Sequence, residues 1–172
     1  LLDKSFKTEY IQKIISKYKP NYLFGPSKYF DKLIKINKVL SLRNYKLFKT
    51  NYKNHKKINK KNLLLLSTSG TTQNPKFVRL SNSNLNNNTK SIIKYLKIKS
   101  DHNTITTMPM GYSYGLSIIN THLSSGSKVI LNNKTVFDRG FWNLIDKYKI
   151  TSFGGVPQLY ELLKQLKFEK IN

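Results

Sequence analysis

The sequence contains no cysteine and no alanine. Without cysteine, disulfides, catalytic thiolates and zinc–thiolate sites are excluded. The three histidines at positions 55, 102 and 122 share no spacing typical of metal ligands, so we expect no metal bound directly by protein side chains. Long apolar runs are missing as well. The longest covers residues 63–66, against roughly 20 residues for a membrane helix, so we predict no membrane span. No secretory leader pattern is found either, and we expect a cytoplasmic protein.

Acidic residues are scarce. Eight Asp and Glu stand against 31 Lys and Arg, which gives a net charge of +23. Such a charge is typical of proteins that bind nucleic acids or anionic membranes. However, only three of the cations are arginines, at positions 43, 79 and 139, and they form no base-reading cluster. A bias toward A- and T-rich codons also explains abundant Lys, Asn and Ile without alanine. Both explanations stay open, and we expect no specific nucleic-acid partner.

The spacing of apolar residues predicts several helices and strands. We expect helices near residues 10–18, 85–96, 116–123, 141–148 and 159–166, and strands near 22–24, 63–67, 77–80, 104–108, 129–131 and 151–153. For residues 28–50 we expect a short helix and then one or two strands. For residues 52–62 we expect an exposed loop. Ser81 or Ser83 is expected to cap the second helix, and Asp138 the fourth. The alternation from residue 101 onward predicts an α/β fold with mostly parallel sheets flanked by helices.

A hydroxyl-rich turn at residues 68–76 follows the buried strand at 63–67. Its hydroxyls and backbone N–H groups suit a concave anion site, and Gly70 allows close approach because it has no Cβ. Lys76 adds a positive charge suited to a polyphosphate. An ordinary Ser/Thr-rich hairpin turn is the alternative. The Walker pattern and the Gly-x-Gly-x-x-Gly pattern are both absent, which disfavours P-loop kinases and dinucleotide dehydrogenases.

Residues 68–76, Thr-Ser-Gly-Thr-Thr-Gln-Asn-Pro-Lys, resemble the phosphate-loop motif of the adenylate-forming (AMP-binding) superfamily, which includes acyl-CoA synthetases. Residues 77–85, 108–116 and 152–157 resemble its next motifs, in the same order. The residues of these motifs are most similar to those of acyl-CoA synthetases associated with surface polysaccharide synthesis. The sequence departs from the family pattern at four positions: Gln73 and Phe77 replace glycines, Asn82 replaces a histidine, and Tyr112 replaces the histidine of many members.

The resemblance implies that residues 1–172 are an incomplete large N-terminal AMP-binding domain, without the C-terminal lid domain. It implies ATP-dependent activation of a small-molecule carboxylic acid to an acyl-adenylate, with Mg²⁺, and then transfer to coenzyme A or another thiol. The catalytic residues are expected beyond Asn172, so the piece alone is expected to be inactive. The implied phosphate-binding residues are Thr68, Ser69, Gly70, Thr71, Thr72 and Lys76. The implied acyl or thiol pocket comprises Tyr112, Tyr114, Gly154, Gly155 and Pro157.

Each assignment has a structural alternative. Tyr112 and Tyr114 could instead pack in the core. Residues 154–157 could form an ordinary strand-to-helix turn, and Lys76 could be a solvated side chain. Residues 108–118 contain no carboxylate to pair with an ammonium group, which disfavours an amino-acid substrate. Two other functions stay open for the chain: a basic nucleic-acid-binding module, and a non-catalytic family member, as Gln73 and Phe77 suggest.

Overall fold

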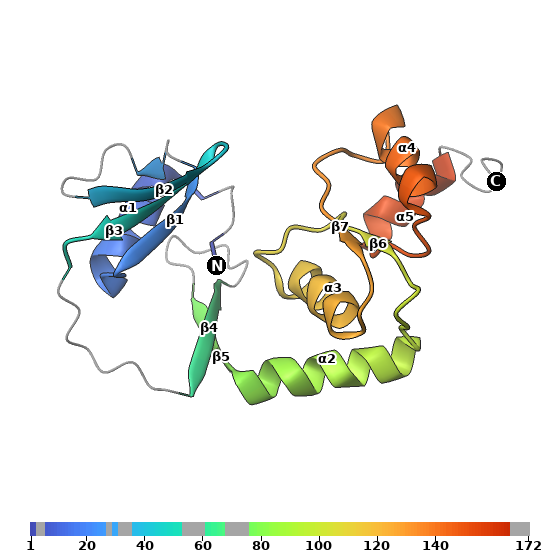
Figure 1. Cartoon of the computed structure of the whole chain (residues 1–172), viewed down its shortest axis with the longest axis horizontal. Helices are drawn as coiled ribbons and strands as arrows, with labels where there is room; N and C mark the ends of the chain where they lie inside the picture. Colours follow the sequence, from blue (N-terminus) through green and yellow to red (C-terminus); the bar gives the residue numbers. More distant parts are fainter. Residues whose placement is uncertain (3–5, 27–28, 31–35, 53–60, 68–75, 166–172) are drawn as a thin grey trace. The chain divides into compact units, whose positions relative to one another are not determined.

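The computed structural model describes residues 1–2, 6–26, 29–30, 36–52, 61–67 and 76–165 (Figure 1). The chain divides into two compact units. One comprises Lys4–Asn59, and the other comprises Leu1–Asp3 together with Lys60–Asn172.

The Lys4–Asn59 unit packs one helix on an antiparallel sheet. Its elements are α1 (Thr8–Tyr18), β1 (Tyr22–Pro26), β2 (Ile36–Leu42) and β3 (Tyr45–Thr50), with strand order β1-β3-β2. Ile11 and Ile15 of α1 are buried against Phe30 and Phe48, so the helical apolar spacing forms the core. The expected helix and strands are confirmed. The predicted short helix falls largely on residues outside the described ranges, as does most of the loop predicted at 52–62.

The second unit begins with an antiparallel hairpin and a helix. β4 (Asn62–Ser67) pairs with β5 (Phe77–Ser81), and Ser67 lies opposite Phe77. Helix α2 (Asn82–Leu96) follows at once. The Ser81 hydroxyl oxygen accepts from the Asn84 backbone N–H at 3.1 Å, and the Asn84 side chain accepts from the Ser81 N–H at 2.9 Å. Ser81, and not Ser83, is therefore the cap.

The rest of this unit is the parallel α/β part that the sequence predicts. β6 (Thr104–Ile105) pairs in parallel with β7 (Val129–Ile130), and Thr104 forms a parallel bridge with Ser152. Helices α3 (Ser113–Ser124), α4 (Arg139–Tyr148) and α5 (Pro157–Gln165) complete it. Ile105, Val136, Phe141 and Leu163 form its core. The α/β fold class is confirmed, with parallel pairing from residue 104 onward and antiparallel pairing in the two upstream sheets.

Some helix ends differ from the simplest expectation. Asp138 occupies the N-cap position of α4, but its side chain makes no capping bond, so the predicted capping role is wrong. Its carboxylate instead accepts from the Thr135 N–H at 2.6 Å and from the Thr135 hydroxyl at 2.9 Å. Among the described residues, three helices end on a lysine with positive φ, where glycine is the usual residue: Lys19, Lys97 and Lys149.

Candidate functional site

The carboxyl ends of the parallel strands lead directly into two of the segments that the sequence analysis singled out. β6 leads into residues 106–112, which precede α3, and the bridge at Ser152 leads into residues 153–156, which precede α5 (Figure 1). In open α/β sheets, ligands bind outside the carboxyl ends of the strands. This edge is therefore the candidate functional site of the unit.

Side-chain hydroxyls join the two segments at this edge. Thr104 donates its hydroxyl to the Ser152 carbonyl at 2.9 Å. Three residues further along, Thr107 donates its hydroxyl to the Gly154 carbonyl. Tyr114, in the first turn of α3, donates its phenol to the Gly155 carbonyl at 3.4 Å. We call Thr107, Tyr114, Gly154 and Gly155 the hydroxyl clamp.

The glycines of the clamp are tightly packed. A Cβ at Gly154 would overlap the Ile118 side chain and would lie 2.9 Å from the Tyr114 hydroxyl oxygen. A Cβ at Gly155 would lie 2.8 Å from Cδ2 of Leu159. The structure thus brings together three of the five predicted pocket residues.

The other two predicted pocket residues lie next to the clamp along the chain. Tyr112 is the N-cap residue of α3 and is half-buried, with its backbone N–H donating to the Pro109 carbonyl at 3.2 Å. Pro157 is the first residue of α5 and is exposed. Neither contributes a hydrogen bond to the clamp among the described residues.

Sequence reasoning missed Thr107 and gave His122 no role at this site. His122 is 6% exposed. Its Nδ1 lies 2.8 Å from the Ile118 carbonyl oxygen and its Nε2 lies 3.3 Å from the Ser152 hydroxyl. This residue connects α3 to the segment preceding Gly154. For Thr107, the available signal was a hydroxyl residue just past a strand and just before Pro109, where the backbone loses an N–H donor.

The predicted phosphate-binding residues Thr68, Ser69, Gly70, Thr71 and Thr72 lie outside the described residues, as does Gln73. The structure does place both ends of their segment. Ser67 is buried and pairs with Phe77, and the exposed Lys76 directly precedes that strand. Ser67 and Phe77, the residues on either side of 68–76, therefore lie opposite each other, and the phosphate-binding role of 68–76 stays a prediction.

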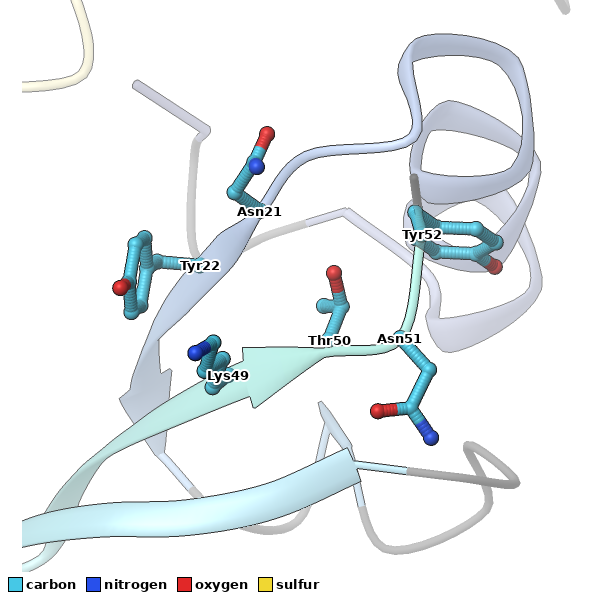
Figure 2. Close-up of a pocket in the computed structure, with 6 residues that line it drawn as sticks. All are labelled: Asn21, Tyr22, Lys49, Thr50, Asn51 and Tyr52. Carbon is cyan, nitrogen blue, oxygen red and sulfur yellow. The ribbon is translucent and has the colours of Figure 1, made fainter. Parts of the chain in front are cut away.

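A separate hollow of about 420 Å³ lies in the Lys4–Asn59 unit. Figure 2 shows its lining, which is Asn21, Tyr22, Lys49, Thr50, Asn51 and Tyr52. The Thr50 hydroxyl already donates to the Pro20 carbonyl at 2.5 Å. None of the predicted site residues lines this hollow, so it adds nothing to the candidate site.

No group of three or more His, Asp or Glu in residues 1–165, outside the gaps given above, is arranged to hold a metal ion. Among the same residues, no helix combines the length and the apolar character needed to cross a membrane.

Comparison with known proteins finds relatives that are named as a CoA ligase and an acyl-CoA synthetase. The oxalate–CoA ligase of Arabidopsis thaliana is 31% identical over 102 residues, covering 58% of this chain and 20% of that protein. The acyl-CoA synthetase ALT10 of Alternaria alternata is 35% identical over 109 residues, covering 62% and 18%. The matched region is thus about a fifth of the length of these curated relatives.

Solved structures agree with this result. ATP-bound MatB from Rhodopseudomonas palustris superposes with a TM-score of 0.50 at 31% identity, over 58% of this chain and 19% of that one. The o-succinylbenzoate CoA synthetase MenE from Bacillus subtilis, in complex with its acyl-adenylate intermediate, gives a TM-score of 0.69 over 96% of this chain and 44% of that one. At 16% identity, this second likeness shows the fold alone. The sequence model of AMP-binding enzymes matches residues 3–172, and the chain therefore belongs to the AMP-binding enzyme family.

Proposed function

We propose that this chain is part of the large N-terminal domain of an enzyme that uses ATP to convert a carboxylic acid to an acyl-adenylate. The acyl group then passes to a thiol such as coenzyme A. One observation carries the proposal beyond family membership. Two segments that resemble family motifs, 108–116 and 152–157, meet at the carboxyl edge of the parallel strands through the Tyr114–Gly155 hydrogen bond. The relatives named as CoA ligases and synthetases support the same reaction class.

In the proposed reaction, a carboxylate oxygen attacks the α-phosphorus of ATP, and the bond from that phosphorus to the pyrophosphate oxygen breaks. Pyrophosphate leaves, and AMP stays joined to the acyl group. The protein contributes mainly positioning and neutralisation of negative charge. We assign Thr68, Ser69, Gly70, Thr71 and Thr72 to donate to the β- and γ-phosphates, with Lys76 steadying the loop or the phosphates. Mg²⁺ enters as the complex with ATP, as a part of the substrate.

The acid itself is assigned to the carboxyl edge. Tyr112 and Tyr114 line the acyl pocket or the thiol tunnel, and Gly154, Gly155 and Pro157 form its floor. In the second step, the thiol sulfur attacks the carbonyl carbon of the acyl-adenylate, and AMP leaves. Residues 1–172 carry this binding surface but only part of the machinery, so we expect them to form no acyl-adenylate on their own. Pyrophosphate release from acid and ATP by this piece alone would contradict that expectation.

Isotope exchange between pyrophosphate and ATP in the complete enzyme tests the proposal, because it measures only the first step. We expect exchange to depend on an added carboxylic acid. The double substitution of Thr71→Ala with Thr72→Ala is expected to raise the KM for ATP about tenfold or more, since it removes hydroxyl donors from the loop. Ser83→Ala, on the exposed side of α2, is the matched control.

The experiment distinguishes failure of the ligase function from failure of the phosphate-loop assignment. If no acid in a broad panel supports exchange by the wild-type enzyme, the ligase function is wrong, and a non-catalytic role takes its place. If exchange occurs but the double variant keeps the wild-type KM for ATP, only the assignment of the phosphate loop is wrong.

A further inference from the structure

The backbone pairing beside β6 ends before the clamp begins. On one side, the Thr106 N–H donates to the Ile130 carbonyl at 2.9 Å. On the other side, the Thr151 N–H donates to the Asn103 carbonyl at 2.9 Å, and Thr104 bridges Ser152. Among the described residues, no backbone hydrogen bond continues this second row to Gly154. Beyond this point, side-chain hydroxyl groups donate the hydrogen bonds that join the two segments.

The sequence explains why a side chain takes over. Pro109 has no N–H and stops the strand, and the chain turns there before α3 begins at Ser113. Thr107 is the last hydroxyl residue before this turn, and its hydroxyl reaches the Gly154 carbonyl. Gly154 has no side chain of its own with which to anchor its backbone. Its position therefore depends on its neighbours, and among the described residues it is Thr107 that donates a hydrogen bond to it.

Thr104 provides a built-in comparison for Thr107. Both donate a hydroxyl to a carbonyl of the same segment, Thr104 to Ser152 and Thr107 to Gly154. Thr104 is fully buried inside the sheet, at 0% exposed, whereas Thr107 is half-buried at its carboxyl edge. Thr104 thus supports the sheet, and Thr107 supports the backbone at the carboxyl edge of the sheet.

We propose that Thr107 is a positioning residue for acid activation: it holds the Gly154 carbonyl and thereby fixes the 154–155 backbone as one wall of the acid pocket. The inference rests on the proposed function. Thr107 touches neither ATP nor the reacting atoms in this proposal. Its loss should therefore change the binding of the acid and leave the phosphate loop unaffected.

The test compares Thr107→Val, Thr107→Ser and Thr104→Val in the complete enzyme, with pyrophosphate–ATP exchange as the assay. Valine keeps the shape of threonine and removes the hydroxyl, and serine keeps the hydroxyl. We expect Thr107→Val to raise the KM for the acid about tenfold, because a small misplacement of a binding wall weakens productive binding. The KM for ATP should stay within about twofold of wild type, and Thr107→Ser should restore the KM for the acid.

The control variant and the melting temperature separate positioning from plain stability. Thr104→Val should lower the melting temperature and leave the KM for the acid near the wild-type value. If Thr107→Val leaves that KM unchanged, or raises the KM values for acid and ATP equally, the positioning role is overturned while the proposed function stands. If serine fails to restore the KM for the acid, the hydroxyl is not the cause and the inference is likewise overturned. Absence of acid-dependent exchange in the wild-type enzyme would remove the proposed function, and the inference with it.

Discussion

At Gly115, α3 passes so close to the preceding turn that a methyl group would collide with backbone. A Cβ there would overlap the Pro109 carbonyl oxygen and lie 2.8 Å from the Met108 carbonyl oxygen. Gly115→Ala should therefore destabilise the fold by about 1–3 kcal/mol, as overpacking does, although alanine favours a helix by about 1 kcal/mol. Urea unfolding of the purified protein measures the difference.

Gly140, the second residue of α4, is the matched control. A Cβ there would meet the flexible end of the Lys134 side chain, with Nζ at 2.9 Å, which can move away. Gly140→Ala should be neutral or stabilising by up to about 1 kcal/mol. Equal effects of the two substitutions would show that the Pro109 contact does not limit residue 115.

Asp138 gives a prediction on pH. The hydrogen bonds from the Thr135 N–H and then from the Thr135 hydroxyl hold the pKa of this carboxyl below its ordinary value. Because the pKa is lower in the folded state, the resulting stability is present above the pKa of the unfolded chain and is lost as pH falls through the folded-state value. Asp138→Asn should weaken the acid dependence of unfolding, measured by urea titration at several pH values. Thr135→Val should have an intermediate effect, because it keeps the backbone donor. An unchanged acid dependence in both variants would contradict the assignment.

The sequence allowed some site residues to be placed and not others. Tyr114, Gly154 and Gly155 were predicted as pocket residues because their segments resemble family motifs, and the structure brings these three residues together. Thr107 was missed because its partner is a main-chain carbonyl far away in sequence, and a carbonyl carries no residue-specific signal. The capping role of Asp138 failed for a related reason: Thr135 offers two donors at once and outcompetes the helix terminus.

At the scale of elements, the lysines that end three helices are an energetic cost. Lys149 has φ of 48° and ends α4, with its N–H donating to the Asp146 carbonyl at 3.4 Å. A residue with a Cβ pays roughly 1 kcal/mol or more in this conformation, and glycine pays little. Lys149→Gly should therefore stabilise the protein by about 0.5–1 kcal/mol in thermal or urea unfolding.

Lys147→Gly is the control for that substitution. Lys147 lies in the last turn of the same helix, so glycine there should cost about 1 kcal/mol. The two substitutions remove the same charge from neighbouring positions and should have opposite signs. Destabilisation by both would show that charge, and not backbone conformation, governs this helix end.

Helices were predicted better than strands. The spacing of Ile11 and Ile15 or of Leu159 and Leu163 reports which side of a helix is buried, and this information is local. Strand length depends on partners that are distant in sequence. The strand expected at 104–108 is shortened to Thr104–Ile105, and the Thr106 hydroxyl then accepts from the Asn132 N–H at 2.9 Å. Antiparallel pairing in the Lys4–Asn59 sheet was likewise invisible in the apolar pattern.

At the scale of the whole molecule, positive charge dominates. Lys and Arg outnumber Asp and Glu by 31 to 8 along the chain. We expect weak binding to any polyanion at low salt, with an affinity that falls steeply as salt rises. Fluorescence titration with duplexes of two unrelated sequences and with heparin should give similar affinities at about 50 mM salt and little binding at about 200 mM.

The double substitution at Thr71 and Thr72 should not change this binding, since it removes no charge. A preference for one duplex, or binding that persists at the higher salt, would instead favour the nucleic-acid-binding module. That result would also assign a function to lysines which codon bias otherwise explains.

The clamp has a consequence for selectivity that follows from its chemistry. In a chain where 31 of 172 residues are cationic, the side chains of Thr107 and Tyr114 bring no charge to this edge, and Gly154 and Gly155 bring no side chain. In the acid pocket that we propose, a substrate tail lying along these groups would meet a neutral surface whose shape the clamp fixes. Such a surface would select among acids by their size and shape. The clamp residues would offer no counter-ion to an acid with a second carboxylate.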